Sequence, residues 1–225
     1  RSEAATRGVR LNTDFIDNPA GVNCSDQEVN IKIALGPVVR SGRLTLAARD
    51  TLLRDMTGDV ASAVLRNNYQ QSLALSLAER RAPADLAAST RLIRSLEARG
   101  LLDRALEALP TDREIAERQR GARGLVRPEL AVLLSYGKIA LLHDLLASKV
   151  PDDPFMGDLL IDYFPPVLQR DYASDLAQHR LRREIIATTL TNGLVNRLGA
   201  PTPLLLADET GRPVTDTAFA FMAAR

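Results

Sequence analysis

Residues 12–33 read NTDFIDNPAGVNCSDQEVNIKI, and this stretch decides the fold that we expect around it. From Gly8 to Ile16 apolar and polar residues alternate, which is typical of a half-buried strand. The run Asp17-Asn18-Pro19 then predicts a turn. Ser25 and Glu28 have the spacing of a capping box, so we expect a helix to begin there and to end at Gly36-Pro37.

The expected strand, turn and helix form a geometry that suits an anionic ligand. In α/β proteins ligands bind beyond the carboxyl ends of strands, and a helix N-terminus offers free N–H groups and a partial positive charge. The Ser25 hydroxyl would add one more donor. Taken alone, however, a Ser-x-x-Glu pattern is more often only a helix cap. Asp14 and Asp17 are better explained as turn formers than as metal ligands, because their spacing fits no EF-hand loop and no histidine is near.

Beyond this stretch nearly every segment predicts a helix. The two ends of each expected helix are marked by threonines, prolines or glycines, which flank apolar residues at helical spacing. The expected helices are those starting at Thr45 and at Thr57, Asp85 to Arg99, one capped by Thr111 and Glu114, Leu130 to Ser148, and Ala173 to Leu198 with Gly199 as C-cap. A charged, proline-containing connector near residues 80–84 predicts a boundary between residues 1–80 and a helical region at 81–225.

Composition excludes several classes of protein. The chain has 225 residues, is 45% hydrophobic and 25% charged, and carries a formal net charge of +1, so it has no global field that would attract nucleic acid or an anionic membrane. The aromatic content of 4% also argues against a nucleic-acid-binding domain. The apolar stretch from Leu130 to Ala147 is interrupted by charged residues and is shorter than the about 20 residues that a bilayer requires, so we expect a buried helix and no membrane partner.

Cys24 is the only cysteine, which fits a reducing compartment, and we expect the cytoplasm. The first methionine is Met56, and Arg1 to Arg10 carries charges where a secretory signal would be apolar. We therefore expect the chain to be a piece of a longer protein.

Residues 12–33 closely resemble the signature N-T-D-x-I-D-N-x-A-G-V-x-x-S-D-x-E-V-N-I-K-I of the large bacterial NAD-specific glutamate dehydrogenases. They also resemble the shorter motif N-A-G-G-V-x-x-S-x-x-E of hexameric glutamate dehydrogenases, although Pro19 and Ala20 depart from it. The resemblance implies a mainly α fold. A terminal strand and helices from the end of a Rossmann-type dehydrogenase domain would occupy residues 1–80, followed by an irregular C-terminal helical domain over residues 81–225.

The same resemblance implies the roles of three residues. Ser25 and Val22 would contact the glutamate substrate, and Asn18 would lie beside the nicotinamide end of NAD. The reaction implied is the oxidative deamination of L-glutamate to 2-oxoglutarate and ammonium. The catalytic lysine, the catalytic aspartate and the glycine-rich dinucleotide turn of the family would lie upstream of Arg1, so we expect no catalytic residue and no metal site here, and an inactive chain when it is isolated.

The resemblance continues through later motifs, to which we assign structural roles. They lie at residues 101–104, 127–134, 163–165 and 179–185. His143 and His179 have no cysteine or carboxylate pattern around them and predict no metal site. We expect contacts with the remainder of the same enzyme and a homo-oligomer. The alternative is a stand-alone helical interaction or regulatory module that retains a relic of the signature.

Overall fold

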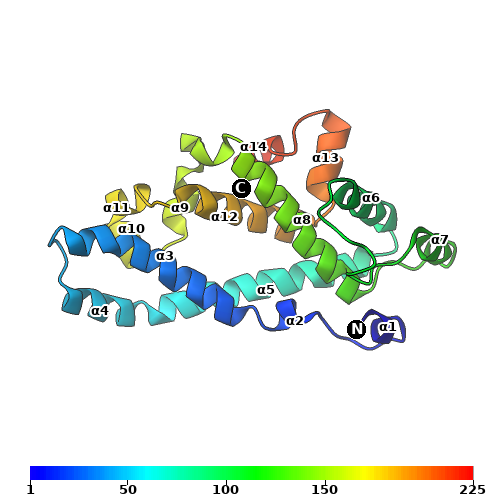
Figure 1. Ribbon diagram of the computed structural model, residues 1–225, viewed down its shortest axis with the longest axis horizontal. Coiled ribbons are helices and arrows are strands. Elements are labelled where there is room, and N and C mark those ends of the chain that lie inside the picture. The colour runs from blue at the N-terminus through cyan, green and yellow to red at the C-terminus, as the bar shows by residue number, and fades with distance from the viewer. Residues whose placement is uncertain (225) are drawn as a thin grey trace.

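The computed structural model describes residues 1–224, which are built almost entirely from helices (Figure 1). The first nine elements are α1 (Ser2–Thr6), α2 (Asp14–Asp17), α3 (Ala20–Arg40), α4 (Leu46–Asp55), α5 (Thr57–Arg81), α6 (Leu86–Ala98), α7 (Asp112–Arg120), α8 (Arg127–Ala147) and η1 (Val150–Asp152). The others are η2 (Pro154–Met156), α9 (Gly157–Asp162), α10 (Pro166–Asp171), α11 (Ala173–Ala177), α12 (Arg182–Leu198), α13 (Thr202–Thr210) and α14 (Asp216–Ala223).

The predicted strand from Gly8 to Ile16 is wrong. Residues 1–224 contain no strand, so the segment has no neighbour with which to form a ladder of hydrogen bonds. Residues 9–13 are non-helical, and Asp14–Asp17 forms the short helix α2, which places Ile16 in the core. The expected mainly α fold is confirmed, whereas the strand that would end a Rossmann-type domain is not present in the described chain.

Both predicted ends of the signature helix are also wrong. Helix α3 begins at Ala20 with Pro19 at its N-cap, so Ser25 lies in the second turn and caps nothing. At the other end Pro37 lies inside the helix, which continues to Arg40. Burial of Leu35 and Val38 offsets the backbone hydrogen bond that the proline removes.

Two capping signals elsewhere are confirmed, whereas Thr57 and Asp85 make no side-chain cap at the starts of α5 and α6. The Thr45 hydroxyl accepts a hydrogen bond from the Ala48 N–H at 3.2 Å and starts α4. Thr111 and Glu114 form a complete capping box at α7, in which the Thr111 N–H donates to Glu114 Oε2 at 2.7 Å. The expected single helix from Ala173 to Leu198 is instead two helices, α11 and α12, because the chain breaks around His179.

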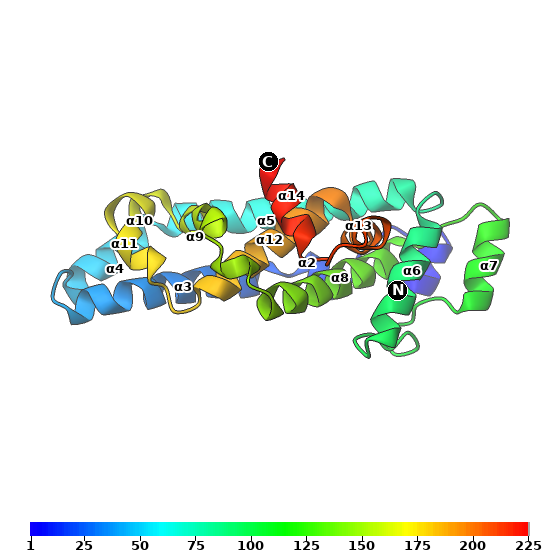
Figure 2. The same cartoon turned by 90° about the horizontal axis from the view of Figure 1, so that it is seen from above.

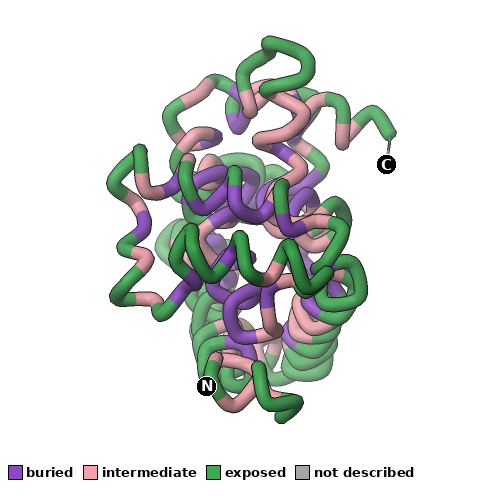
Figure 3. Tube along the Cα trace, turned by 90° about the vertical axis from the view of Figure 1, so that its right-hand side faces the viewer, coloured by how far each residue is buried: buried purple, intermediate pink, exposed green. Residues whose placement is uncertain are grey.

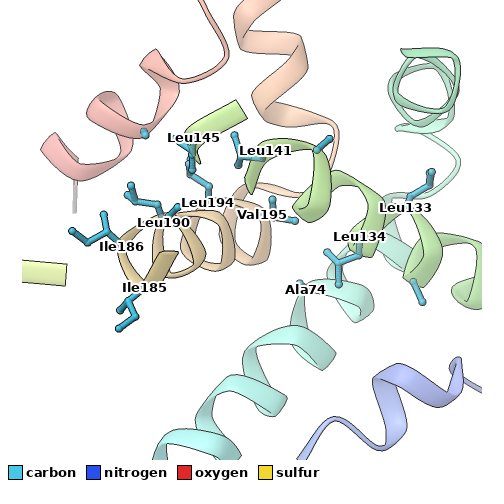
Figure 4. Packing of buried hydrophobic residues seen from close by; sticks show 14 of the residues in the cluster. Ala74, Leu133, Leu134, Leu141, Leu145, Ile185, Ile186, Leu190, Leu194 and Val195 are labelled. Carbon is cyan, nitrogen blue, oxygen red and sulfur yellow. The ribbon is translucent and has the colours of Figure 1, made fainter. Parts of the chain in front are cut away.

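Two pairs of long helices form the body of the molecule. Helices α3 and α5 run side by side and are joined at one end by α4, and α8 and α12 pack together and onto α5 (Figures 1 and 2). Buried residues concentrate where these helices meet, while the outer sides of the molecule are exposed (Figure 3). Leucines 141 and 145 of α8 lie with Leu190 and Leu194 of α12 in this core (Figure 4).

Helix α8 is long and apolar enough, by length and composition alone, to cross a membrane. Half of its most apolar window is buried inside the protein, where Leu134, Leu141 and Leu145 contact neighbouring helices. This degree of burial is typical of the central helix of a folded core.

Two connectors approach each other closely beside the start of α8. A Cβ atom built on Gly124 would overlap the backbone carbonyl group of Ala82, and Ala82 itself is buried. Only a glycine therefore allows the loop before α8 to pack against the end of α5.

Candidate functional site

The three residues expected to meet substrate and cofactor lie at the start of α3 and are exposed. Val22 and Ser25 are three positions apart in the helix, which places their side chains on the same side of it. Val22 is 74% exposed. Asn18 lies one turn earlier, in the bend between α2 and α3, and is also exposed.

The Ser25 hydroxyl makes no hydrogen bond to any other side chain or backbone group of residues 1–224. It is therefore free to bind an external group. Because Ser25 lies in the second turn, its site does not include the free N–H groups of the helix N-terminus, and the predicted anion site based on those groups is not formed around this residue.

Arg127 anchors the segment that precedes α2. Its Nε donates to the Asn12 side-chain oxygen, and its Nη1 contacts Ser76 Oγ and Glu79 Oε2, both at 3.2 Å. The guanidinium group therefore joins the beginning of the signature to α5 and to the first turn of α8.

A second polar cluster anchors α3 directly after Ser25, at Asp26 and Asn30. The Tyr163 hydroxyl donates to Asp26 Oδ2 at 3.0 Å and accepts from Asn30 Nδ2 at 2.9 Å. Burial raises the pKa of Tyr163, which keeps its hydroxyl protonated and able to donate.

His179 lies at the break between α11 and α12 and also binds α3. Its Nδ1 accepts from the Leu181 N–H at 3.1 Å, so its Nε2 carries the proton and donates to the Asn30 backbone oxygen at 3.1 Å. Burial lowers the pKa of His179, which favours this neutral form. The motifs around residues 127, 163 and 179, expected to be structural, thus hold the signature segment at both ends.

A neighbouring face of α3 borders a cleft of about 650 Å³ that also involves α5, α9, α12 and α14. Asn23, Asp26 and Gln27 line it, whereas Val22 and Ser25 do not. Sequence reasoning missed this cleft because its other walls come from segments more than thirty residues away along the chain. No group of three potential metal-ligating side chains was found in the described part of the chain.

The chain is similar to known proteins over its whole length. The family model "Bacterial NAD-glutamate dehydrogenase, catalytic domain" matches residues 1–78, and the model "Glutamate dehydrogenase, C-terminal" matches residues 122–225. The NAD-specific glutamate dehydrogenases of Halomonas elongata and Pseudomonas aeruginosa are each 48% identical to the whole chain. The enzyme of that name from Mycobacterium tuberculosis is 37% identical over 99% of it.

The chain belongs to the NAD-specific glutamate dehydrogenase family. It spans 14% of the length of each of these three relatives, so it corresponds to a C-terminal part of a much larger glutamate dehydrogenase. The resemblance first seen in residues 12–33 is confirmed.

Proposed function

We propose that this chain belongs to an enzyme that oxidatively deaminates L-glutamate to 2-oxoglutarate and ammonium with NAD. In this proposal residues 1–80 complete the catalytic region, where α2 to α5 close a Rossmann-type domain whose strands are supplied by other parts of the enzyme. Residues 81–225 form the C-terminal helical domain. The match of a catalytic-domain model to residues 1–78 supports this over a stand-alone helical module.

The observation that carries the proposal is the exposed, unpaired hydroxyl of Ser25 beside the exposed Val22 side chain on one side of α3. The hydroxyl would donate a hydrogen bond to a carboxylate of glutamate, while Val22 would contact the methylene carbons. Both residues would hold the substrate in place and would not react with it. Such positioning supplies much of the rate of a hydride transfer.

NAD would receive the hydride from the substrate, and the pyrophosphate of NAD would bind elsewhere in the enzyme. Residues 1–224 contain no strand that leads into a glycine-rich turn, and so the chain lacks the elements that usually hold a dinucleotide. The one cofactor contact that we assign to this chain is made by the exposed carboxamide of Asn18, which would lie beside the nicotinamide end of NAD. We further propose a cytoplasmic homo-oligomer in which other parts of the enzyme cover the outer sides of α3 and α5.

The test is the Ser25→Ala variant in the full-length enzyme. Loss of one charge-assisted hydrogen bond, about 1.5 to 3 kcal/mol, should lower kcat/KM for glutamate roughly 10- to 150-fold in steady-state assays of NADH formation. Ser174→Ala, at an exposed position of α11, is the matched control and should leave the kinetics unchanged. Wild-type kinetics in Ser25→Ala would remove Ser25 from the substrate site.

A further inference from the structure

Half of the residues that line the cleft beside α3 carry an amide or a hydroxyl group. Its carboxamides come from three helices, α3, α5 and α12, and we call it the carboxamide cleft after the six residues that supply them: Asn23, Gln27, Asn67, Gln70, Asn192 and Asn196. A volume of about 650 Å³ lies within the range of small-molecule sites.

Two of these carboxamides have buried atoms that bond to nothing in residues 1–224. The Nδ2 atom of Asn23 and both the Nδ2 and Oδ1 atoms of Asn196 are shielded and have no hydrogen-bond partner. Buried polar groups are nearly always paired in folded proteins. Both residues line the cleft, so a rotation of either carboxamide would present its unpaired donor to an acceptor bound between α3 and α12.

The charges at the cleft favour an anion. Arg66 and Arg197 line it, and neither guanidinium lies within 4 Å of a carboxylate of the described chain, although Arg197 stacks over the Phe221 ring at 5.6 Å from its centroid. The acidic side chain in the lining, Asp26, is already engaged, since it accepts hydrogen bonds from Tyr163 and Asn30. Planar guanidinium groups bind carboxylates in a bidentate manner.

We infer that the carboxamide cleft is a second ligand site that binds a short dicarboxylate, with one carboxylate facing the arginines and the carboxamides bonding the rest of the molecule. The site is separate from the proposed substrate contact. Asn23 and Gln27 lie one turn apart on the face of α3 that lines the cleft, whereas Val22 and Ser25 do not line it. The inference therefore does not depend on the role proposed for Ser25.

The experiment measures binding of succinate to the full-length enzyme by isothermal titration calorimetry. Arg66→Gln should weaken binding by about tenfold or more, because it removes a charge-assisted pair. Arg80→Gln removes the same charge from an exposed position of the same helix outside the cleft, and it should bind succinate as the wild type does. Succinamide, which has the same size without the charges, should not bind.

Two further measurements distinguish binding in the carboxamide cleft from binding at the substrate site and from general anion binding. Succinate affinity should be unchanged in Ser25→Ala, whether or not that variant alters glutamate turnover. A loss of affinity there would place succinate at the substrate site and overturn the inference. Equal affinities in Arg66→Gln and Arg80→Gln, no succinate binding to the wild type, or tighter Arg66-dependent binding of inorganic phosphate would also overturn it.

Discussion

At the scale of single residues, Lys138 carries a charge that is unfavourably desolvated by the fold. It lies on the core helix α8, and its Nζ donates to Gln71 Oε1 at 3.0 Å. Desolvation lowers the pKa of Lys138 from 10.5 to about 8. Lys138 is therefore a partly buried residue whose ammonium group opposes folding at neutral pH.

Replacing Lys138 with methionine should stabilise the fold at pH 7. Below pH 8 both the folded and unfolded states carry the proton, so the wild type bears the full desolvation penalty, of about 1 to 3 kcal/mol. Between pH 8 and 10.5 the folded state loses the proton first, and wild-type stability rises. Thermal unfolding followed by circular dichroism should therefore show a higher Tm for Lys138→Met at pH 7 and a smaller difference at pH 10.

Lys149→Met provides the control, because Lys149 is exposed and its replacement should leave Tm nearly unchanged. A Lys138→Met variant that is less stable than wild type at pH 7 would show that the bond to Gln71 outweighs desolvation.

At the scale of elements, an ion pair joins α7 to the start of α8. Arg118 binds Glu129 through two contacts, of 2.5 and 2.8 Å, and the Glu129 side chain is 2% exposed. Glu129 also accepts from the Val126 N–H at 2.8 Å, so one carboxylate both caps α8 and holds α7 against it. The pairing raises the pKa of Arg118 and keeps it charged.

The Arg118→Met variant should lose about 3 to 5 kcal/mol of unfolding free energy, since it leaves a buried carboxylate unpaired. Arg113→Met offers a matched comparison within α7, because Arg113 pairs with Glu117 on the surface and its loss should cost less than about 1 kcal/mol. Urea unfolding of both variants measures the difference. Equal losses would mean that solvent reaches Glu129.

Helix ends were predictable from sequence where the deciding contact is local. Thr111 and Glu114 lie within one turn, so their spacing alone sets the start of α7. The same spacing at Ser25 and Glu28 was misleading, because Pro19 is the N-cap and the helix already begins at Ala20, five residues before Ser25. The break at His179 could not be predicted, since its deciding partner, Asn30, is 149 residues away.

At the scale of the whole molecule, the C-terminal helices hold the signature segment. Arg127 binds Asn12, and Tyr163 and His179 bind α3 at Asp26 and Asn30. The identity of the signature residues was readable from sequence, while the groups that fix their position come from distant parts of the chain and required the structure.

Tyr163→Phe should loosen α3, because it removes the hydroxyl that links Asp26 and Asn30. In the full-length enzyme we expect faster hydrogen exchange in residues 20–30 and a higher KM for glutamate, by about tenfold for the loss of one to two hydrogen bonds. Tyr172→Phe is the control, since it removes a tyrosine hydroxyl outside this cluster. Unchanged exchange in Tyr163→Phe would show that packing alone holds the helix.

The contact between Gly124 and Ala82 has a consequence for mutational tolerance. The loop has no space for a methyl group at residue 124, so any other amino acid would push the start of α8 away from the end of α5. Gly58, by contrast, has open space around its missing side chain. In a saturation library selected for folding, we expect position 124 to return a single amino acid and position 58 to return many.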